Sequence, residues 1–226
     1  VLDDEVECRH VMRLLCPADT SAAAGSVEAS PPASVVPEPV AAAPRMALKM
    51  VTWNIAGASM SCQVPSGFVL QDKLAIVVSE VLRWGADIAA LQECPSGAAL
   101  VGLESCYVLL GAERVAVQGA YVHLYVRKGL DAELRTKRGR WPGVLVRLVV
   151  DAVAVDVAAV HLEPGPQGAD ERKRQLSAVS SDAGSPAMIV LGDFNIRLEE
   201  EDPLLECTGC RNASYSGFSW DPRVVR

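Results

Sequence analysis

The sequence predicts an α/β fold in which two β-sheets pack against each other and helices cover the outside. Segments with the patterns of strands and of helices alternate from Ala47 onward, and several strand-like segments follow one another with no helix between them. The chain has 226 residues, half of them hydrophobic, which is enough for one domain with a sizeable core. No apolar run approaches the roughly 18 residues of a membrane span, so no membrane association is expected.

The chain divides into three segments. Residues 1–16 are interpreted as a short N-terminal segment, the end of an upstream module. Residues 17–46 are rich in Ala, Pro and Ser, with five prolines in the fourteen residues PPASVVPEPVAAAP, and are expected to be a disordered linker. Residues 47–226 form the folded domain.

Hydrophobic periodicity gives the elements of this domain in order. The stretch 47–55 is strand-like, and the stretch 70–85 is helical, with Gly85 as its C-terminal stop. The predicted apolar face of this helix carries Leu70, Leu74, Val77, Val78, Val81 and Leu82. Further strands are predicted over 86–93, 106–111, 120–129, 143–150, 152–161 and 187–193, and an exposed amphipathic helix over 169–183.

Polar residues follow four of these strands at the point where each ends. They are Asn54, the pair Gln92 and Glu93, the run His161-Leu162-Glu163, and Asp193 with Asn195. Each has an ordinary structural explanation when taken singly, such as a turn former, a rim carboxylate, a core histidine or a helix cap. Because functional groups concentrate at strand ends on a rigid scaffold, we expect several of these ends to share one site.

The chemistry of phosphodiester hydrolysis requires this combination of groups. Mg2+ prefers one or two carboxylates plus waters and substrate oxygens, so Glu93 is the expected metal ligand. Asp193 is expected to orient or deprotonate the attacking water, while neutral Asn and His side chains hold phosphate oxygens without repelling them. In an extended segment, Asp193 and Asn195 would share one face, with Phe194 turned into the packing.

These motifs resemble those of the endonuclease/exonuclease/phosphatase superfamily. The matching pieces, in the family's order, are TWN (52–54), LQE (91–93), HLE (161–163) and GDFN (192–195). Within the superfamily the chain is most similar to the 5′-tyrosyl-DNA phosphodiesterases, through TWNIAG, HLEPG followed by ERKRQL, GDFNIR and FSWD. The resemblance implies a four-layer α/β/β/α sandwich.

The resemblance also implies the roles of individual residues. Glu93 would bind Mg2+, with Mn2+ as an alternative, and Asp193 would accept or donate the proton, with His161 and Asn195 as its catalytic partners. The scissile phosphate and the DNA 5′ end, which carries a tyrosyl adduct, would be contacted by Asn54, Glu163, Arg197 and Trp220.

Two positions depart from the family pattern. Ala56 stands where the family commonly has an Asp, so a weaker or water-dependent metal site is expected. The family's C-terminal SDH motif, which supplies a catalytic Asp-His pair, does not occur up to Arg226. We therefore expect a domain that is truncated at its C-terminus and lacks its final strands, with weak or no activity on its own.

Alternatives remain open at this stage. One is another phosphodiesterase of the superfamily, such as an abasic endonuclease, a deadenylase or a sphingomyelinase-like enzyme; another is a non-catalytic adaptor with a decayed site. Net charge is -7, so the whole molecule lacks the basic character of many nucleic-acid binders, and only RTKRGR (135–140) and Arg172–Arg174 offer basic surface. Trp141 is expected to cap the core. Seven scattered cysteines indicate reduced thiols. A monomer in the nucleus, or in the cytoplasm, is expected from the DNA-repair interpretation.

Overall fold

Two four-stranded sheets and two α-helices make up the fold. The computed structural model describes residues 48–55, 70–115, 119–135, 141–185 and 187–196. Sheet A has the strand order β1-β2-β4-β3 and sheet B the order β5-β6-β7-β8. The strands are β1 (Met50–Asn54), β2 (Ile88–Cys94), β3 (Tyr107–Arg114), β4 (Tyr121–Arg127), β5 (Ala132–Leu134), β6 (Gly143–Val150), β7 (Val153–His161) and β8 (Ala187–Asp193); the helices are α1 (Leu70–Trp84), α2 (Ala169–Asp182) and the short 3-10 helix η1 (Pro166–Gly168).

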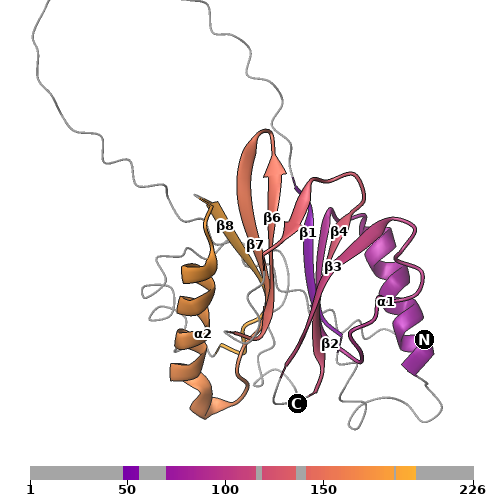
Figure 1. The fold of residues 1–226 in the computed structure, drawn as a ribbon. Coiled ribbons are helices and arrows are strands. Elements are labelled where there is room, and N and C mark those ends of the chain that lie inside the picture. Colours follow the sequence, from indigo (N-terminus) through magenta and orange to yellow (C-terminus); the bar gives the residue numbers. More distant parts are fainter. Residues whose placement is uncertain (1–47, 56–69, 116–118, 136–140, 186, 197–226) are drawn as a thin grey trace, which may run out of the picture.

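The layers follow one another in the order α2, sheet B, sheet A and α1 (Figure 1). This arrangement confirms the predicted α/β class with two packed sheets and helices outside. Each sheet is mixed, because each contains one parallel pair, β1 with β2 and β7 with β8, while the other pairs are antiparallel. The two parallel pairs are the part of the fold that matters for function, since the carboxyl ends of parallel neighbours lie at the same sheet edge.

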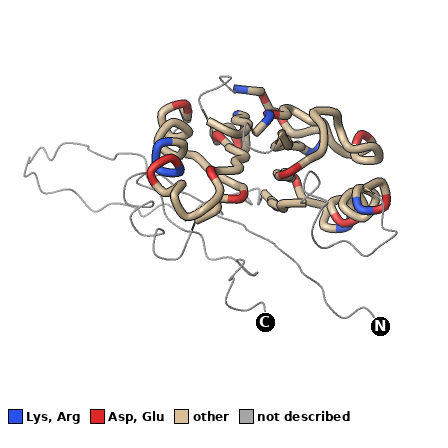
Figure 2. The backbone as a smooth tube through the Cα atoms, turned by 90° about the horizontal axis from the view of Figure 1, so that it is seen from below, with Lys and Arg blue, Asp and Glu red and all other residues tan. Residues whose placement is uncertain are grey.

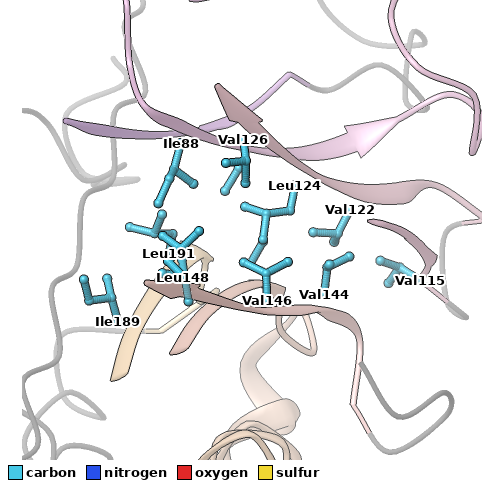
Figure 3. Packing of buried hydrophobic residues seen from close by; sticks show 13 residues of the cluster. Ile88, Val115, Val122, Leu124, Val126, Val144, Val146, Leu148, Ile189 and Leu191 are labelled. Carbon is cyan, nitrogen blue, oxygen red and sulfur yellow. The ribbon is translucent and has the colours of Figure 1, made fainter. Parts of the chain in front are cut away.

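Three apolar layers hold the sandwich together. The central layer lies between the sheets, where Leu124 and Val126 of sheet A face Val146, Leu148 and Leu191 of sheet B (Figure 3). The second layer lies between sheet A and α1, and the third between sheet B and α2. Alternation along each strand sends one set of side chains to the central layer and the other set to a helix, which explains why these strands are apolar on both faces.

Helix α1 packs on sheet A through the face that periodicity predicts. Val77 and Val81 are buried, and the N–H of Gly85 donates to the carbonyls of Val81 and Leu82 at 3.2 and 3.1 Å. Gly85 has φ 56°, a backbone conformation that glycine adopts without strain, so it closes the helix as expected. The assignment of Leu82 to the apolar face is wrong: its side chain is 38% exposed, because it lies about 100° around the helix from Val81.

Some predicted boundaries differ from the structure. The short strand β5 was not predicted, since its three residues Ala-Glu-Leu carry no strand pattern, and β3 continues to Arg114, beyond the expected end at Gly111. Trp141 is a core residue, as expected, and its Nε1 donates to Asp182 Oδ2 at 3.0 Å. The segments 1–16 and 17–46 and the expected loss of final strands concern residues outside the described part of the chain. None of the described helices is long and apolar enough to cross a membrane.

A buried ion pair joins sheet B to the segment between α2 and β8. Asp156 on β7 is fully buried and accepts from Arg147 Nε and Nη2 at 2.9 and 3.2 Å. It also accepts from the backbone N–H groups of Gly184 and Ser185 at 2.7 and 2.8 Å. Burial alone would raise the pKa of the Asp156 carboxyl, but these hydrogen bonds outweigh it and hold that pKa below its usual range.

Replacing Asp156 with Asn is expected to lower the free energy of unfolding by about 3 kcal/mol at pH 7, because it leaves Arg147 without its carboxylate. A lowered folded-state pKa contributes stability that is present above the unfolded pKa of about 4 and is lost as pH falls through the folded value. Urea unfolding should therefore show a difference between the variant and the parent that shrinks toward pH 3. Glu80→Gln is the control, because Glu80 forms a surface ion pair with Arg83 on α1, on the other sheet from Arg147. It should cost less than about 1 kcal/mol, and equal losses for the two variants would contradict the role given to the Asp156 carboxylate.

Candidate active site

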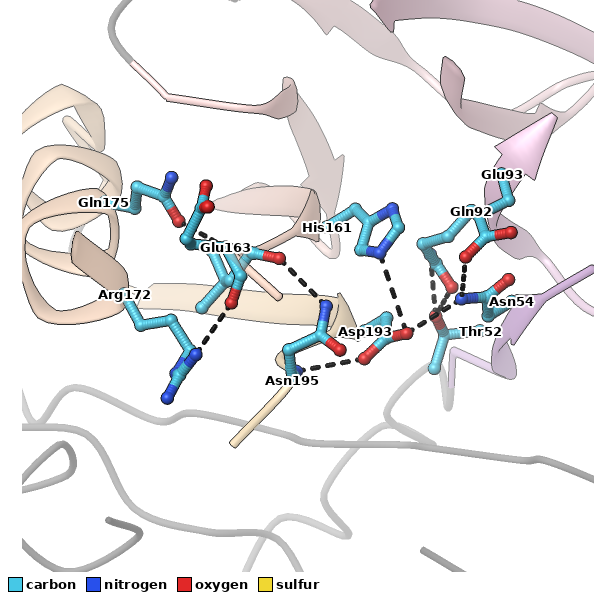
Figure 4. Close-up of polar contacts among 11 residues, drawn as sticks. Thr52, Asn54, Gln92, Glu93, His161, Glu163, Arg172, Gln175, Asp193 and Asn195 are labelled. Atoms are coloured by element: carbon cyan, nitrogen blue, oxygen red, sulfur yellow. Dashed lines mark hydrogen bonds and ion pairs between the residues drawn. The ribbon is translucent and has the colours of Figure 1, made fainter. Parts of the chain in front are cut away.

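The carboxyl ends of both parallel pairs meet at one end of the sandwich. Asn54 ends β1, Glu93 lies near the end of β2, His161 ends β7 and Asp193 ends β8. Figure 4 shows these four side chains turned toward one another from the two sheets. The structure thus brings these four strand ends together in the described residues, and their chemical roles stay predictions.

Strand alternation explains why three of these side chains point between the sheets. Met50 on β1, Val157 and Ala159 on β7, and Ile189 and Leu191 on β8 all belong to the central apolar layer. With a side-chain period of two, the same face continues to Asn54, to His161 and to Asp193. The site is therefore the polar end of the central layer.

The Asn54 amide connects the two sheets. Its Nδ2 donates to Glu93 Oε1 at 3.0 Å and to Asp193 Oδ2 at 2.8 Å. The two hydrogens of one amide nitrogen thus hold two carboxylates side by side. Because like charges in a partly buried place repel each other, this pair of acids stabilises a cation or a proton between them.

Glu93 reaches the site through an irregularity in β2. The register between β2 and β4 shifts between Leu91 and Cys94, so that β2 carries one extra residue there, and Glu93 has φ 58°. Leu91 and Cys94 both pack on the α1 side of sheet A, which leaves Gln92 and Glu93 off that face. A bulge of this kind changes the direction of a side chain, and here it turns the Glu93 carboxylate toward Asn54.

Gln92 and Thr52 form a buried pair behind Asn54 and Glu93. Gln92 Nε2 donates to Thr52 Oγ1 at 3.0 Å, and the Thr52 hydroxyl lies 3.2 Å from Gln92 Oε1. The pair links β1 to β2 one step before Asn54. Both residues belong to the sequence motifs, but the sequence predicts no role for either. A contact between residues 40 positions apart leaves no local pattern.

Asp193 and Asn195 are arranged by a turn, and the expectation of an extended segment is wrong. Strand β8 ends at Asp193, and Asn195 has φ 48°, a left-handed conformation that Asn tolerates better than most residues. The N–H of Asn195 donates to Asp193 Oδ1 at 3.0 Å, and its Nδ2 donates to the Leu162 carbonyl at 2.9 Å. Asn195 therefore holds Asp193 and the end of β7 in place. Phe194 is buried in the α2 layer, as predicted.

His161 lies directly opposite Asp193 in the β7–β8 register. Its ring is 2% exposed, and Nε2 lies 3.8 Å from Asp193 Oδ2, which is too long for a hydrogen bond. Its Nδ1 is buried and has no hydrogen-bond partner in the structure. An imidazole without a complete set of protein partners is suited to accept or donate to a bound oxygen.

The turn after His161 is held by α2. Arg172 is fully buried, and its Nη1 donates to the carbonyls of Glu163 and Gly165 at 2.8 Å each. Gln175 accepts from the Glu163 N–H at 3.0 Å. A Cβ built on Gly168 would lie 3.0 Å from the Glu163 Cγ, so the Glu163 side chain lies toward the start of α2, and the structure gives it no contact with Asp193.

The basic surface expected on α2 is present only in part, because Arg172 is buried where it holds the turn after His161. Arg172 is interior, and the exposed Arg174 pairs with Glu171. Of RTKRGR only Arg135 is described, and it pairs with Glu133. Arg197, Trp220 and Ala56 lie outside the described residues, so their predicted roles stay predictions.

Lys73 on α1 lies within the electrostatic reach of Glu93, which the sequence did not suggest. Burial lowers the pKa of the Lys73 ammonium, and the Glu93 charge partly offsets this. A lysine on an amphipathic helix ordinarily indicates a solvated face, so no local pattern could have identified it. In the described residues no cluster of three or more His, Cys, Asp or Glu side chains forms a ready-made metal cage. Cys94 and Cys106, the cysteines in that part of the chain, are free.

Comparisons with known proteins agree on the fold. A family model described as "Endonuclease/Exonuclease/phosphatase family" matches residues 51–223. Among solved structures, humanized TDP2 from D. rerio superposes with a TM-score of 0.50 at 19% identity, over 70% of this chain and 70% of that one. D. rerio TDP2 complexed with a single-strand DNA product gives 0.50 at 20% identity, over 70% and 64%.

A bacterial structure is similar as well. The β toxin of Staphylococcus aureus, as a β-hairpin deletion mutant, gives a TM-score of 0.56 at 12% identity over 76% of each chain. A search of curated sequences finds no match. At these identities, the structural likenesses show the fold.

Replacing Gly192 with Ala is expected to separate β7 from β8 beside Asp193. Gly192 has φ +151°, and an added Cβ would lie 2.0 Å from the Val160 carbonyl oxygen. Thermal unfolding should show a loss of more than about 3 kcal/mol, as for other overpacked buried sites. Gly129→Ala is the control, because Gly129 also has positive φ, at +95°, and its Cβ would meet nothing within 4 Å. A Gly192 variant no less stable than the Gly129 variant would refute the close contact.

Replacing Asn195 separates the side-chain bond from the backbone strain. Asn195→Ala removes the bond to Leu162 and places Ala in a left-handed conformation, whereas Asn195→Gly removes only the bond. Chemical denaturation should therefore find the Ala variant less stable than the Gly variant by about 1 kcal/mol. The reverse order would mean that the turn relaxes freely.

Proposed function

Because the chain belongs to the endonuclease/exonuclease/phosphatase family, we propose that it is a Mg2+-dependent phosphodiesterase that hydrolyses the 5′-phosphotyrosyl bond between DNA and a trapped topoisomerase. As a member of this family it is a phosphoesterase. The observation that carries the proposal is the Asn54 amide shared by Glu93 and Asp193. Two carboxylates on either side of one amide support the roles proposed here, Glu93 as the metal ligand and Asp193 as the proton acceptor.

The donor set fits a hard divalent cation. Glu93 and Asp193 both accept hydrogen bonds from the Asn54 amide, which orients the two carboxylates but leaves their negative charges in place. Glu93, with 9% of its surface exposed, would be the direct ligand of Mg2+ or Mn2+, and waters and phosphate oxygens would complete the shell. When bound, the cation neutralises charge that develops on the non-bridging phosphate oxygens.

The residues of this chain supply the rest of the reaction. Asp193 takes a proton from the attacking water as its oxygen bonds to phosphorus, and the bond from phosphorus to the tyrosine oxygen breaks. Asn54 keeps Asp193 in position, and Asn195 does so from the other side. His161 would offer a phosphate oxygen its Nε2, the ring nitrogen that lies 3.8 Å from Asp193 Oδ2 on the site side of the ring. The tyrosine oxygen leaves as a phenolate and takes up a proton from solvent, and Asp193 returns its proton to solvent. The products are the tyrosine side chain of the topoisomerase and a 5′-phosphate on DNA.

The leaving group favours a phenolic ester. A phenol has a pKa of about 10 and departs with little help from a general acid, whereas a sugar alkoxide needs such help. The described residues supply a carboxylate that activates water and a metal ligand. These groups therefore best suit an aryl phosphodiester.

We assign DNA contact to residues other than the Lys and Arg side chains of the two helices, because several of those are already in ion pairs. Figure 2 shows Lys and Arg beside Asp and Glu on both helices, and Arg83 with Glu80 and Arg174 with Glu171 are ion pairs. Arg197 and Trp220 are proposed to hold the DNA 5′ end, and Glu163 to line its approach. A nuclear monomer is part of the same proposal.

Other substrates of the family compete with this one. An abasic duplex, a poly(A) tail and sphingomyelin all contain phosphodiesters, and one fold hosts many specificities. The similarity in fold to both TDP2 and β toxin is compatible with each of them. A non-catalytic adaptor is the alternative from another class.

The 226-residue chain is expected to release tyrosine from a 5′-tyrosyl oligonucleotide in the presence of Mg2+, faster than it cleaves an abasic duplex, a poly(A) RNA or sphingomyelin. Asp193→Asn and Glu93→Gln should each reduce this rate by about 100-fold or more, because each removes a group that acts in the transition state. Glu80→Gln changes a surface carboxylate on α1 that pairs with Arg83, and it should leave the rate unaltered.

Each result decides between the alternatives. If the parent cleaves another substrate faster, and both site variants lose that activity, the tyrosyl specificity is wrong and the assignment of the active site stands. Turnover that survives in Asp193→Asn would refute its role as proton acceptor. Absence of metal-dependent cleavage on every substrate would refute the activity proposed for these 226 residues.

A further inference from the structure

The backbone of Glu93 requires an explanation that Asn54 does not provide. Its φ of 58° is unfavourable for a residue with a side chain, at a cost of about 1–3 kcal/mol. Such a conformation persists only where surrounding contacts leave no alternative. Asn54 holds the carboxylate by one hydrogen bond, so the strained main chain must be held from elsewhere.

His123 holds this part of β2 on both sides of Glu93. Its backbone pairs with Leu91, the last residue before the bulge. Its side chain is fully buried, and Nε2 lies 2.7 Å from the carbonyl oxygen of Ser96, three residues after Glu93. One residue of β4 therefore fixes both ends of the segment that contains the extra residue.

The bonds around His123 allow a single tautomer. The Ser96 carbonyl only accepts, so Nε2 carries the hydrogen, and Nδ1 accepts from the Tyr125 hydroxyl at 3.1 Å. The Tyr125 oxygen in turn accepts from the Leu100 N–H at 2.8 Å. Burial lowers the pKa of His123, in keeping with a neutral ring. Every polar atom in this chain of bonds has a partner.

We propose that His123, supported by Tyr125, is a positioning residue that holds the strained Glu93 backbone and thereby directs the Glu93 carboxylate toward Asn54 and the bound cation. The inference rests on the proposed metal site. With Leu91 and Ser96 both fixed, the extra residue of β2 has no room to slip along β4, so the bulge stays at Gln92 and Glu93. Cys94 contributes from within, since its Sγ lies 3.7 Å from the Leu91 carbonyl oxygen.

The test is Mn2+ affinity, measured by calorimetric titration of the folded 226-residue chain, with Glu93→Gln defining the site. His123→Leu removes both side-chain bonds and should raise the Mn2+ Kd more than 10-fold. Tyr125→Phe removes the supporting hydroxyl and should raise it about 3-fold. His123→Gln should bind within about 3-fold of the parent, because its amide donates to Ser96 and accepts from Tyr125.

Tyr107→Phe is the matched control. Tyr107 is a buried tyrosine of the same apolar layer as Tyr125, and its hydroxyl donates to the Ala86 carbonyl at 2.7 Å, near the start of β2 and away from Glu93. Its loss should lower the melting temperature as much as Tyr125→Phe does and leave the Kd within 2-fold of the parent. This comparison separates positioning from general destabilisation and holds even where His123→Leu does not fold.

The outcomes distinguish the inference from the function on which it rests. If Glu93→Gln abolishes binding while Tyr125→Phe and Tyr107→Phe have the same Kd, or while His123→Gln fails to restore affinity, the positioning role is refuted and the metal site stands. If Glu93→Gln binds Mn2+ like the parent, the metal site is wrong and the inference fails with it.

Discussion

The packing of sheet A on sheet B is the constraint from which the rest of the molecule follows. Side chains of both sheets interdigitate in one apolar layer, which sets the distance between the sheets at about 10 Å. Only at that spacing does the Asn54 amide, on the first strand, reach Asp193, which lies 139 positions later. The same layer excludes water from one side of the site, so hydrogen bonds and charges there act in a medium of reduced polarity.

Several residues proposed for chemistry have strained backbones or polar atoms without a hydrogen-bond partner. Glu93 and Asn195 have left-handed backbones, His161 has a buried nitrogen without a partner, and two carboxylates meet at one amide. Each feature destabilises the folded chain, and each is held by neighbours that are well satisfied. These strained and unsatisfied groups lie at one end of a rigid sandwich. A site that is fixed in this way before binding can stabilise a charged ligand without rearranging.

Buried polar groups away from these carboxylates act as the frame. Asp156 joins Arg147 to the segment before β8, Arg172 holds the turn after His161, and His123 holds the segment after Glu93. In each case the side chain bonds to backbone groups of a loop that borders a strand of the candidate site. A loop held this way moves little, because releasing it would leave a buried polar atom unpaired.

The sequence by itself determined the identity of the chemical groups and the elements that carry them. Periodicity located α1, β6 and β8, and the ends of four strands named Asn54, Glu93, His161 and Asp193 as one site. These features are local, since period and strand ends depend on neighbouring residues. Only the tertiary structure decided the direction of the Glu93 side chain and the turn that Asn195 holds. It alone also decided that Arg172 is buried and that His123 bonds to the segment after β2. Their partners lie far apart in the chain, and a contact between distant residues leaves no pattern in the sequence around either one.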